Sequence, residues 1–268
     1  MADPYRKRLS QLARRGRATS PAARPVSSAP PPCVPEGRIV ESGAGAHLLV
    51  EEPASRRIAA EGGPPFPPPG EAFVFEEGGR TIETRRPVFF DLETTGFRST
   101  PLFLSGTLGT GEDGGLVRQR FARDYSEEGS VVESTLEEIA AADCLVSFNG
   151  KSYDLPFLRA RAAIHGIPFR LDLPHLDLLH AARRRWKGRF PDFRLQTLER
   201  LFHREERRDD VPGGDIPDLY HEYVRSGFEP RLMNVFRHNA RDLITLARLF
   251  FLLAGGEEDE GRGGKGVA

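Results

Sequence analysis

The fold of this chain is decided by one stretch, Arg86-Pro87-Val88-Phe89-Phe90-Asp91-Leu92-Glu93-Thr94-Thr95-Gly96. Residues 88–90 form a short apolar run of β-prone side chains, and a proline suits the first position of a strand. Successive side chains of a strand point to opposite faces, so Asp91 and Glu93 point the same way. Two carboxylates at the end of a buried strand are costly unless a positive charge neutralises them. Because Mg²⁺ and Mn²⁺ prefer hard oxygen ligands, the stretch suggests a divalent metal site, with an acidic strand end in solvent as the simpler alternative.

The composition gives no global signature for nucleic acid. The 268 residues carry 38 Lys and Arg against 39 Asp and Glu, so the charges nearly cancel. Cys33 and Cys144 do not make a disulfide framework, and the chain begins without a signal-peptide pattern. We therefore expect a reducing, cytoplasmic setting. No apolar run approaches the length of a membrane span, so we expect no membrane partner.

The composition divides the chain into four segments. Residues 1–37 are rich in Arg, Ala and Pro and are expected to form a disordered basic arm, whose functional alternative is phosphate contact. Residues 38–85 predict a small β-containing N-terminal extension, in which a hairpin precedes a Pro/Gly-rich linker. Residues 86–254 form the main domain. The tail at 255–268 is rich in Gly, Glu and Asp and is expected to be disordered.

The pattern of the main domain predicts an α/β fold. After the first strand, residues 101–108 and 116–121 form a predicted antiparallel hairpin, which gives three antiparallel strands. Ser130 and Glu133 match a capping box, so an amphipathic helix is predicted over 131–142. The later predicted elements are a strand at 144–148, a helix from 154 to 166, a strand near 175–178, and helices at about 193–203, 216–226 and 231–254. Three antiparallel strands followed by parallel ones, flanked by helices, are the ribonuclease H-like mixed-sheet plan.

Acidic residues fall in three places where such a fold would gather them. Asp91 and Glu93 end the first strand, Asp154 opens a helix, and Asp242 lies one turn after His238 on the last helix. Phosphodiester hydrolysis needs such a cluster, because one metal ion activates water and a second stabilises the leaving oxygen. Asp91 is the natural bridging ligand, and a nearby base must accept the proton. Four residues return nearly to the same helix face, so His238 and Asp242 are expected to face the site together.

These motifs resemble those of a known nuclease superfamily. Residues 89–96, 148–158 and 238–243 are similar to motifs of the DEDD exonuclease superfamily. Within it the chain resembles the bacterial YprB-like, ribonuclease H-like group, which further stretches at 173–186, 195–200 and 209–220 support. The resemblance implies a metal-dependent exonuclease acting at 3′ ends, with two Mg²⁺ or Mn²⁺ ions and the ligands Asp91, Glu93, Asp154 and Asp242.

The resemblance also carries expectations about substrate and partners. It implies nucleic acid, with DNA favoured over RNA, a role in DNA repair, and a helicase or another repair protein as partner. One departure concerns His238, which stands four residues before Asp242. That is the spacing of the tyrosine subclass, whereas the histidine subclass usually has five. We expect His238 to be the general base, with fixation of Asp242 by a hydrogen bond as the alternative.

A second set of residues is expected to contact nucleic acid. The run at 183–189 is the most basic ordered stretch and places an aromatic ring among cations. This suits phosphate contact and base stacking as well as it suits a solvated helix end. Lys151 could neutralise a substrate phosphate or lie on the loop surface. The predicted contacts are Thr94, Thr95, Asn149, Lys151, Arg184, Arg185, Trp186 and Lys187.

Other motifs fail on their spacing. The run Gly150-Lys151-Ser152 ends like a phosphate-binding loop, but Leu145 stands where that pattern needs a glycine. His175, Asp177 and His180 have tolerable metal spacing, and for them a structural role is favoured. The sequence therefore predicts a two-metal exonuclease. The alternative from another class is a catalytically silent, nuclease-like module that binds nucleic acid.

Overall fold

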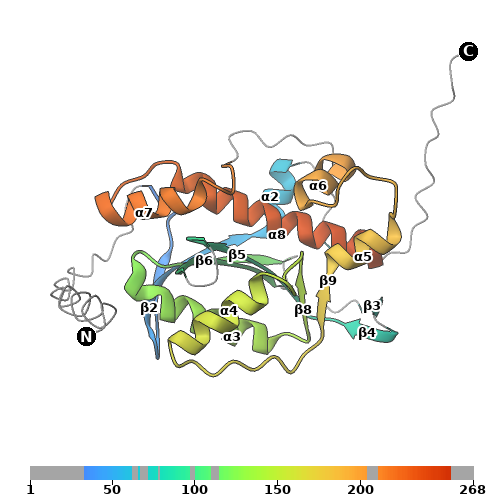
Figure 1. The fold of residues 1–268 in the computed structure, drawn as a ribbon, viewed down its shortest axis with the longest axis horizontal. Coiled ribbons are helices and arrows are strands. Elements are labelled where there is room, and N and C mark those ends of the chain that lie inside the picture. Colours follow the sequence, from blue (N-terminus) through green and yellow to red (C-terminus); the bar gives the residue numbers. More distant parts are fainter. Residues whose placement is uncertain are drawn as a thin grey trace, which may run out of the picture.

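The fold is described here from a computed structural model of the chain (Figure 1). The structure describes residues 33–61, 66, 72–77, 79–96, 100–109, 115–203 and 211–254. The predicted basic arm up to residue 32, most of the Pro/Gly-rich linker, residues 204–210 and the tail from residue 255 lie outside the described residues.

A mixed sheet forms the centre of the described part of the chain, with the strand order β1-β2-β7-β6-β5-β8-β9. The strands are β1 Arg38–Ser42, β2 Gly45–Pro53, β5 Pro87–Thr94, β6 Leu102–Gly109, β7 Leu116–Phe121, β8 Cys144–Ser147 and β9 His175–Asp177. Strands β5, β6 and β7 are antiparallel, whereas β8 and β9 run parallel to β5. The predicted ribonuclease H-like α/β class, with three antiparallel strands and then parallel ones, is confirmed.

The predicted hairpin near residue 44 is present as β1 and β2, and it extends the central sheet. Strand β2 pairs with β7, and residues 47–50 of β2 are all buried. A run that is buried on both faces is typical of an interior strand. The segment predicted as an N-terminal extension therefore contributes two strands to the sheet of the main domain. Strands β3 (Phe73–Glu77) and β4 (Arg80–Thr84) form a separate two-stranded sheet.

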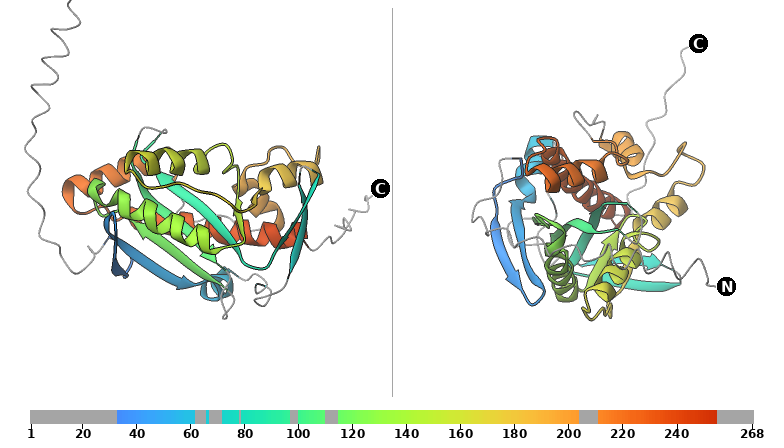
Figure 2. Two further views of the ribbon diagram at one scale, coloured as in Figure 1. Left: turned by 90° about the horizontal axis from the view of Figure 1, so that it is seen from below. Right: turned by 60° about the vertical axis from the view of Figure 1, so that its left-hand side comes forward.

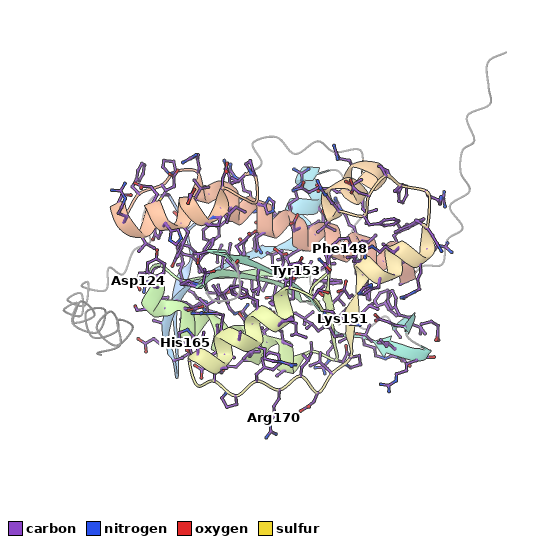
Figure 3. All side chains as sticks on the ribbon, viewed as in Figure 1. Asp124, Phe148, Lys151, Tyr153, His165 and Arg170 are labelled. Carbon is purple, nitrogen blue, oxygen red and sulfur yellow. The ribbon has the colours of Figure 1, made fainter. Side chains whose placement is uncertain are left out.

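Helices cover both faces of the central sheet (Figures 1 and 2). Helices α3 (Glu128–Ala141) and α4 (Asp154–Ile164) lie on one face, and α8 (Leu232–Ala254) crosses the other. Side chains fill the layers between them (Figure 3). The other described helices are α2 Ala54–Glu61, α5 Leu178–Arg185, α6 Leu195–His203 and α7 Ile216–Ser226. None of the helices in the described ranges is long and apolar enough to cross a membrane.

The alternation of side chains along β5 explains the two layers. Val88 and Phe90 pack in a cluster with buried residues of α3 and α4. Phe89 packs in a second cluster with buried residues of α8. Because side chains repeat every second residue along a strand, the face that carries Phe89 also carries Asp91 and Glu93. The strand thus turns its two carboxylates toward α8.

Helix α3 begins earlier than predicted, at Glu128, and buries Ser130 in its first turn. The capping-box prediction is wrong, because Ser130 and Glu133 contact the β1–β2 hairpin instead. Ser130 Oγ lies 2.8 Å from His47 Nδ1, and Glu133 Oε2 accepts a 2.8 Å hydrogen bond from the Ala44 amide. The strand near 175–178 and the helices near 193–203, 216–226 and 231–254 are confirmed as β9, α6, α7 and α8.

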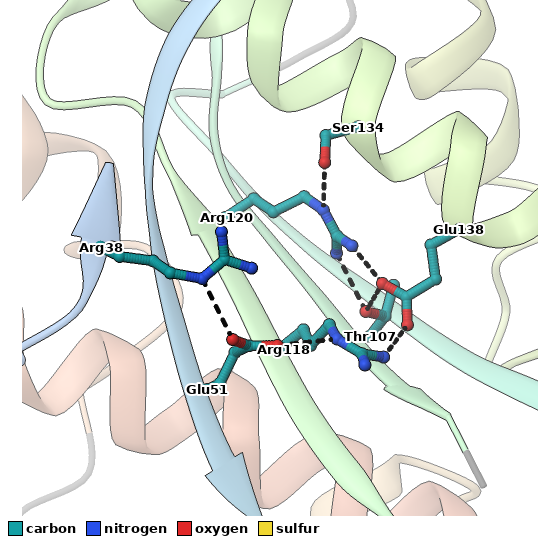
Figure 4. A network of polar contacts seen from close by, with 7 residues as sticks. All are labelled: Arg38, Glu51, Thr107, Arg118, Arg120, Ser134 and Glu138. Carbon is teal, nitrogen blue, oxygen red and sulfur yellow. Dashed lines mark hydrogen bonds and ion pairs between the residues drawn. The ribbon is translucent and has the colours of Figure 1, made fainter. Parts of the chain in front are cut away.

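Buried and partly buried charges tie α3 to the antiparallel strands (Figure 4). Glu138 of α3 pairs with Arg120 and, at 2.9 Å, with Arg118, and it accepts a 2.8 Å hydrogen bond from Thr107 Oγ1. Arg118 also reaches Glu51 of β2 at 3.0 Å. Burial raises the pKa of Glu138, but the two arginines outweigh it and leave the pKa below its usual value. Glu138 therefore stays ionised at neutral pH and links the helix to β6 and β7, and Arg118 extends the network to β2.

Candidate functional site

Strand β5 presents its two carboxylates to neighbouring residues of α8. Asn239 Nδ2 donates a 2.8 Å hydrogen bond to Asp91 Oδ2 and a longer one, of 3.3 Å, to the Asp91 carbonyl oxygen. His238 Nε2 lies 4.0 Å from Glu93 Oε1. Consecutive residues of one helix therefore contact the two carboxylates of the strand, which share one face of the sheet.

Helix α8 brings His238 and Asp242 to this face together. His238 Nε2 lies 3.4 Å from Asp242 Oδ2, one helical turn along the chain. Both side chains are largely buried, with 10% and 14% of their surface exposed. The apolar stripe predicted on this helix is buried, and it fixes the helix's rotation: Leu232, Phe236, Ala240, Leu243 and Ala247. The imidazole is thus within reach of carboxylates from two elements.

Asp154 opens α4 and reaches back to β5. Its carboxylate accepts hydrogen bonds from its own amide and from the amide of Leu92, the residue between Asp91 and Glu93. Burial raises the pKa of Asp154 to about 7, and the negative charge of Asp177 adds to the effect. The third predicted acidic position therefore lies against the same end of β5 as the first.

The carboxylate of Asp177 holds the loop between β8 and α4, a role that was not predicted from the sequence. Asp177 is fully buried at the end of β9. Its Oδ1 accepts hydrogen bonds from the amides of Asn149 at 2.7 Å and Leu179 at 3.1 Å, and its Oδ2 accepts one from the Lys151 amide at 3.1 Å. Asn149 has a φ of 62°, a left-handed conformation that is unfavourable for most residues. An aspartate just before a helical run is an N-cap signal that could have drawn attention to Asp177.

The group His175, Asp177 and His180, considered for metal binding from its spacing, has structural roles. His175 Nε2 lies 2.7 Å from Ser147 Oγ, and burial, helped by the charge of Lys151, lowers the pKa of His175 to about 4. His180 is exposed on α5, whereas Asp177 is fully buried. The structural interpretation favoured from the sequence agrees with these contacts.

Three of the predicted nucleic-acid contacts are engaged within the protein. The hydroxyl groups of Thr94 and Thr95 donate to nearby backbone carbonyl groups at 2.9 and 3.0 Å. Lys151 Nζ pairs at 2.7 Å with Glu77 of β3. Figure 3 shows Lys151 and Tyr153 close to the start of α4. Tyr153 is 66% exposed and is not among the predicted contacts.

The basic run at the end of α5 is exposed except for its aromatic residue. Arg184, Arg185 and Lys187 are exposed. Trp186 is only 3% exposed and packs against Phe190, with ring centroids 6.0 Å apart. Base stacking needs an accessible ring face, so the structure does not support this role for Trp186. The indole is apolar and large, and its burial anchors the helix end beneath the cations.

The donor set fits a hard divalent cation in its chemistry. Asp91, Glu93, Asp154 and Asp242 offer carboxylate oxygens, and the raised pKa of Asp154 indicates surroundings that a positive charge would stabilise. Within the described part of the chain, however, no group of three or more His, Cys, Asp or Glu side chains is arranged to hold a metal ion as it stands. A cation would have to draw these carboxylates closer together.

Comparisons with known proteins agree with this geometry. Residues 88–254 match a family described as the RNase_H superfamily. The chain is 32% identical over 167 residues to the uncharacterized protein YprB of Bacillus subtilis (strain 168), a match covering 60% of this chain and 40% of YprB. The fold resembles part of a family B DNA polymerase from the hyperthermophilic archaeon Pyrobaculum calidifontis. That comparison has a TM-score of 0.50 and 19% identity, and covers 66% of this chain and 26% of the polymerase. Since the family match spans more than half of the sequence, the chain belongs to the RNase_H superfamily.

Proposed function

We propose that this protein is a metal-dependent exonuclease of the DEDD type, which hydrolyses phosphodiester bonds at nucleic-acid ends. Membership of the RNase_H superfamily supports a nuclease that acts on nucleic acid. The observation that carries the proposal is that Glu93 of β5 and Asp242 of α8 lie 4.0 and 3.4 Å from His238 Nε2, while Asp154 of α4 accepts a hydrogen bond from the Leu92 amide of β5. Gathering carboxylates in a buried place is costly, and their use as cation ligands explains why a fold would do so.

In this proposal Asp91, Glu93, Asp154 and Asp242 would hold Mg²⁺ or Mn²⁺, in keeping with the general use of divalent ions by RNase H-like nucleases. Two bound ions would supply electrostatic stabilisation of the charge that develops during phosphodiester cleavage. His238 accepts the proton of the attacking water at Nε2, the atom that lies 3.4 Å from Asp242 and 4.0 Å from Glu93. The neighbouring carboxylates then stabilise the protonated imidazole.

The substrate in this proposal is DNA in preference to RNA, degraded from the 3′ end, and the setting is DNA repair together with a helicase or another repair protein. The exposed cations Arg184, Arg185 and Lys187 support contact with a phosphate backbone, since such contact needs no sequence readout. Lys151 can contribute only if a substrate phosphate competes with Glu77 for its ammonium group.

The test is digestion of matched single- and double-stranded DNA and RNA, labelled at either end, by the full chain with Mg²⁺, Mn²⁺ or a chelator. Stepwise loss from 3′ ends of DNA that needs a divalent ion is the expected result. Asp91→Asn should abolish cleavage, because a neutral amide is a poor bridging ligand. Asp172→Asn, a matched change at an exposed position, should leave it intact. If the wild-type chain binds these oligonucleotides but cleaves none, it is a silent binding module instead.

A further inference from the structure

One row of residues across the sheet lies directly beneath Asn239. Asp91 of β5 is opposite Gly106 of β6, and Gly106 is opposite Gln119 of β7. Residues paired across neighbouring strands point to the same face. Across the three strands the row therefore consists of a carboxylate, a glycine and an amide, and α8 crosses above it.

The glycine in this row makes room for the side chain of Asn239. A Cβ atom built at Gly106 would lie 2.1 Å from Asn239 Oδ1, closer than atoms in contact can approach. Asn239 is fully buried and Gln119 is 3% exposed. The amide of Asn239 thus occupies the space that any other residue at position 106 would fill.

The orientation of the Asn239 amide is set by Gln119. Gln119 Nε2 donates hydrogen bonds to Asn239 Oδ1 at 2.9 Å and to the carbonyl oxygen of Phe236 at 2.8 Å. With its oxygen held in this way, Asn239 turns Nδ2 toward Asp91 and donates to Oδ2 at 2.8 Å. The flipped amide would set donor against donor at Gln119 and oxygen against the carboxylate at Asp91. Only this orientation of the Asn239 amide places a donor against an acceptor at both Gln119 and Asp91.

We infer that Asn239, oriented by Gln119, is a positioning residue that fixes the rotation of the Asp91 carboxylate before a cation binds. This inference rests on the proposed function, because it assigns Asp91 to the metal site. Outer partners that hydrogen-bond to ligating carboxylates orient them, and losing one typically costs about 10–100-fold in metal affinity or activity. Gln119 acts at a distance: it contacts Asn239, which in turn holds the ligand.

Two neutral substitutions test the inference in the full chain. Asn239→Ala removes the donor to Asp91, and Gln119→Met removes the group that orients this donor. Each should weaken Mn²⁺ binding measured by calorimetry and lower kcat on a labelled oligonucleotide, by about 10–100-fold, with little change in KM. The double variant should be no worse than Asn239→Ala alone, because the two residues act as one unit. Asn234→Ala on the same helix, which loses only an exposed hydrogen bond with Arg237, is the matched control.

The measurements separate positioning from a purely structural role. Both variants should unfold at lower temperature, so Mn²⁺ affinity and kcat are compared well below the unfolding transition. If both values then match wild type, the amide pair only joins α8 to the sheet and the inference is overturned. If wild type binds Mn²⁺ without cleaving any substrate and the variants weaken that binding, the proposed function falls and the positioning role stands. Wild type that binds no Mn²⁺ at all overturns both.

Discussion

The carboxylate of Asp177 offers the sharpest test of how the site is built. Asp177→Ala removes the acceptor of three amide hydrogen bonds, from Asn149, Lys151 and Leu179. The Leu179 amide is buried, so leaving it unpaired costs about 1–3 kcal/mol. The other two amides lie in a part-buried loop where water can replace the carboxylate, at about 1 kcal/mol each.

The sum, about 3–5 kcal/mol, corresponds to a fall in Tm of about 10 °C for a chain of this size. Asp177→Asn should cost less, because Oδ1 still serves the amides of Asn149 and Leu179. Its new amide group then faces the donor of Lys151, so only that side of the loop is released. The charge is also lost, which should lower the pKa of Asp154 in the metal-free protein.

Calorimetric unfolding measures the loss of stability. Hydrogen exchange of a peptide spanning residues 149–153 measures the release of the loop. Exchange should accelerate in both variants and more strongly in Asp177→Ala. Asp172→Asn, an exposed change in the preceding segment, is the control. A Tm for Asp177→Ala within about 2 °C of wild type would refute the reasoning, since one buried unpaired amide alone predicts more.

Three further outcomes are expected. His238→Ala should lower turnover by about 10²–10⁴-fold with little change in Mn²⁺ affinity, and His238→Tyr should retain more activity; loss of metal binding instead would make the histidine structural. Replacing Arg184, Arg185 and Lys187 by Ala should weaken DNA binding and flatten its dependence on salt. An unchanged slope of affinity against salt would mean that this basic run is only a solvated surface. Burial and neighbouring arginines lower the pKa of His47 to about 4, whereas the unfolded value is near 6.5. Its contribution to stability is therefore complete above pH 6.5 and is lost as the pH falls toward 4. Urea midpoints measured across that range should fall less steeply in His47→Asn, and parallel curves would contradict the assignment.

The sequence predicted those parts of the site that follow from local periodicity. Alternation along a strand placed Asp91 and Glu93 on one face, and the helical repeat placed His238 beside Asp242. Both rules act over a few residues, so they hold before the tertiary structure is known. The order of strands followed in the same way, from turn residues and apolar runs.

What the sequence did not predict depends on contacts between distant segments. The bond between Asn239 and Asp91 joins residues from opposite ends of the domain, and it needs a glycine on the neighbouring strand β6. Ser130 looked like a helix cap but contacts His47, because the hairpin packs on that turn. Trp186 looked accessible among cations, yet its ring is buried. Local patterns contain no information about which neighbour will compete for a polar or aromatic side chain.

The pairing of β2 with β7 has a consequence for the solubility of the domain. The match to the RNase_H superfamily begins at residue 88, so β2 precedes the matched region, whereas its partner β7 lies within it. Without β2, strand β7 would offer an open row of backbone donors and acceptors, a template on which a second copy could add a strand. With the hairpin in place, the edge strand of the sheet is β1, which is short and carries the exposed charges Arg38 and Glu41. The β1–β2 hairpin therefore protects the domain against edge-to-edge association through β7.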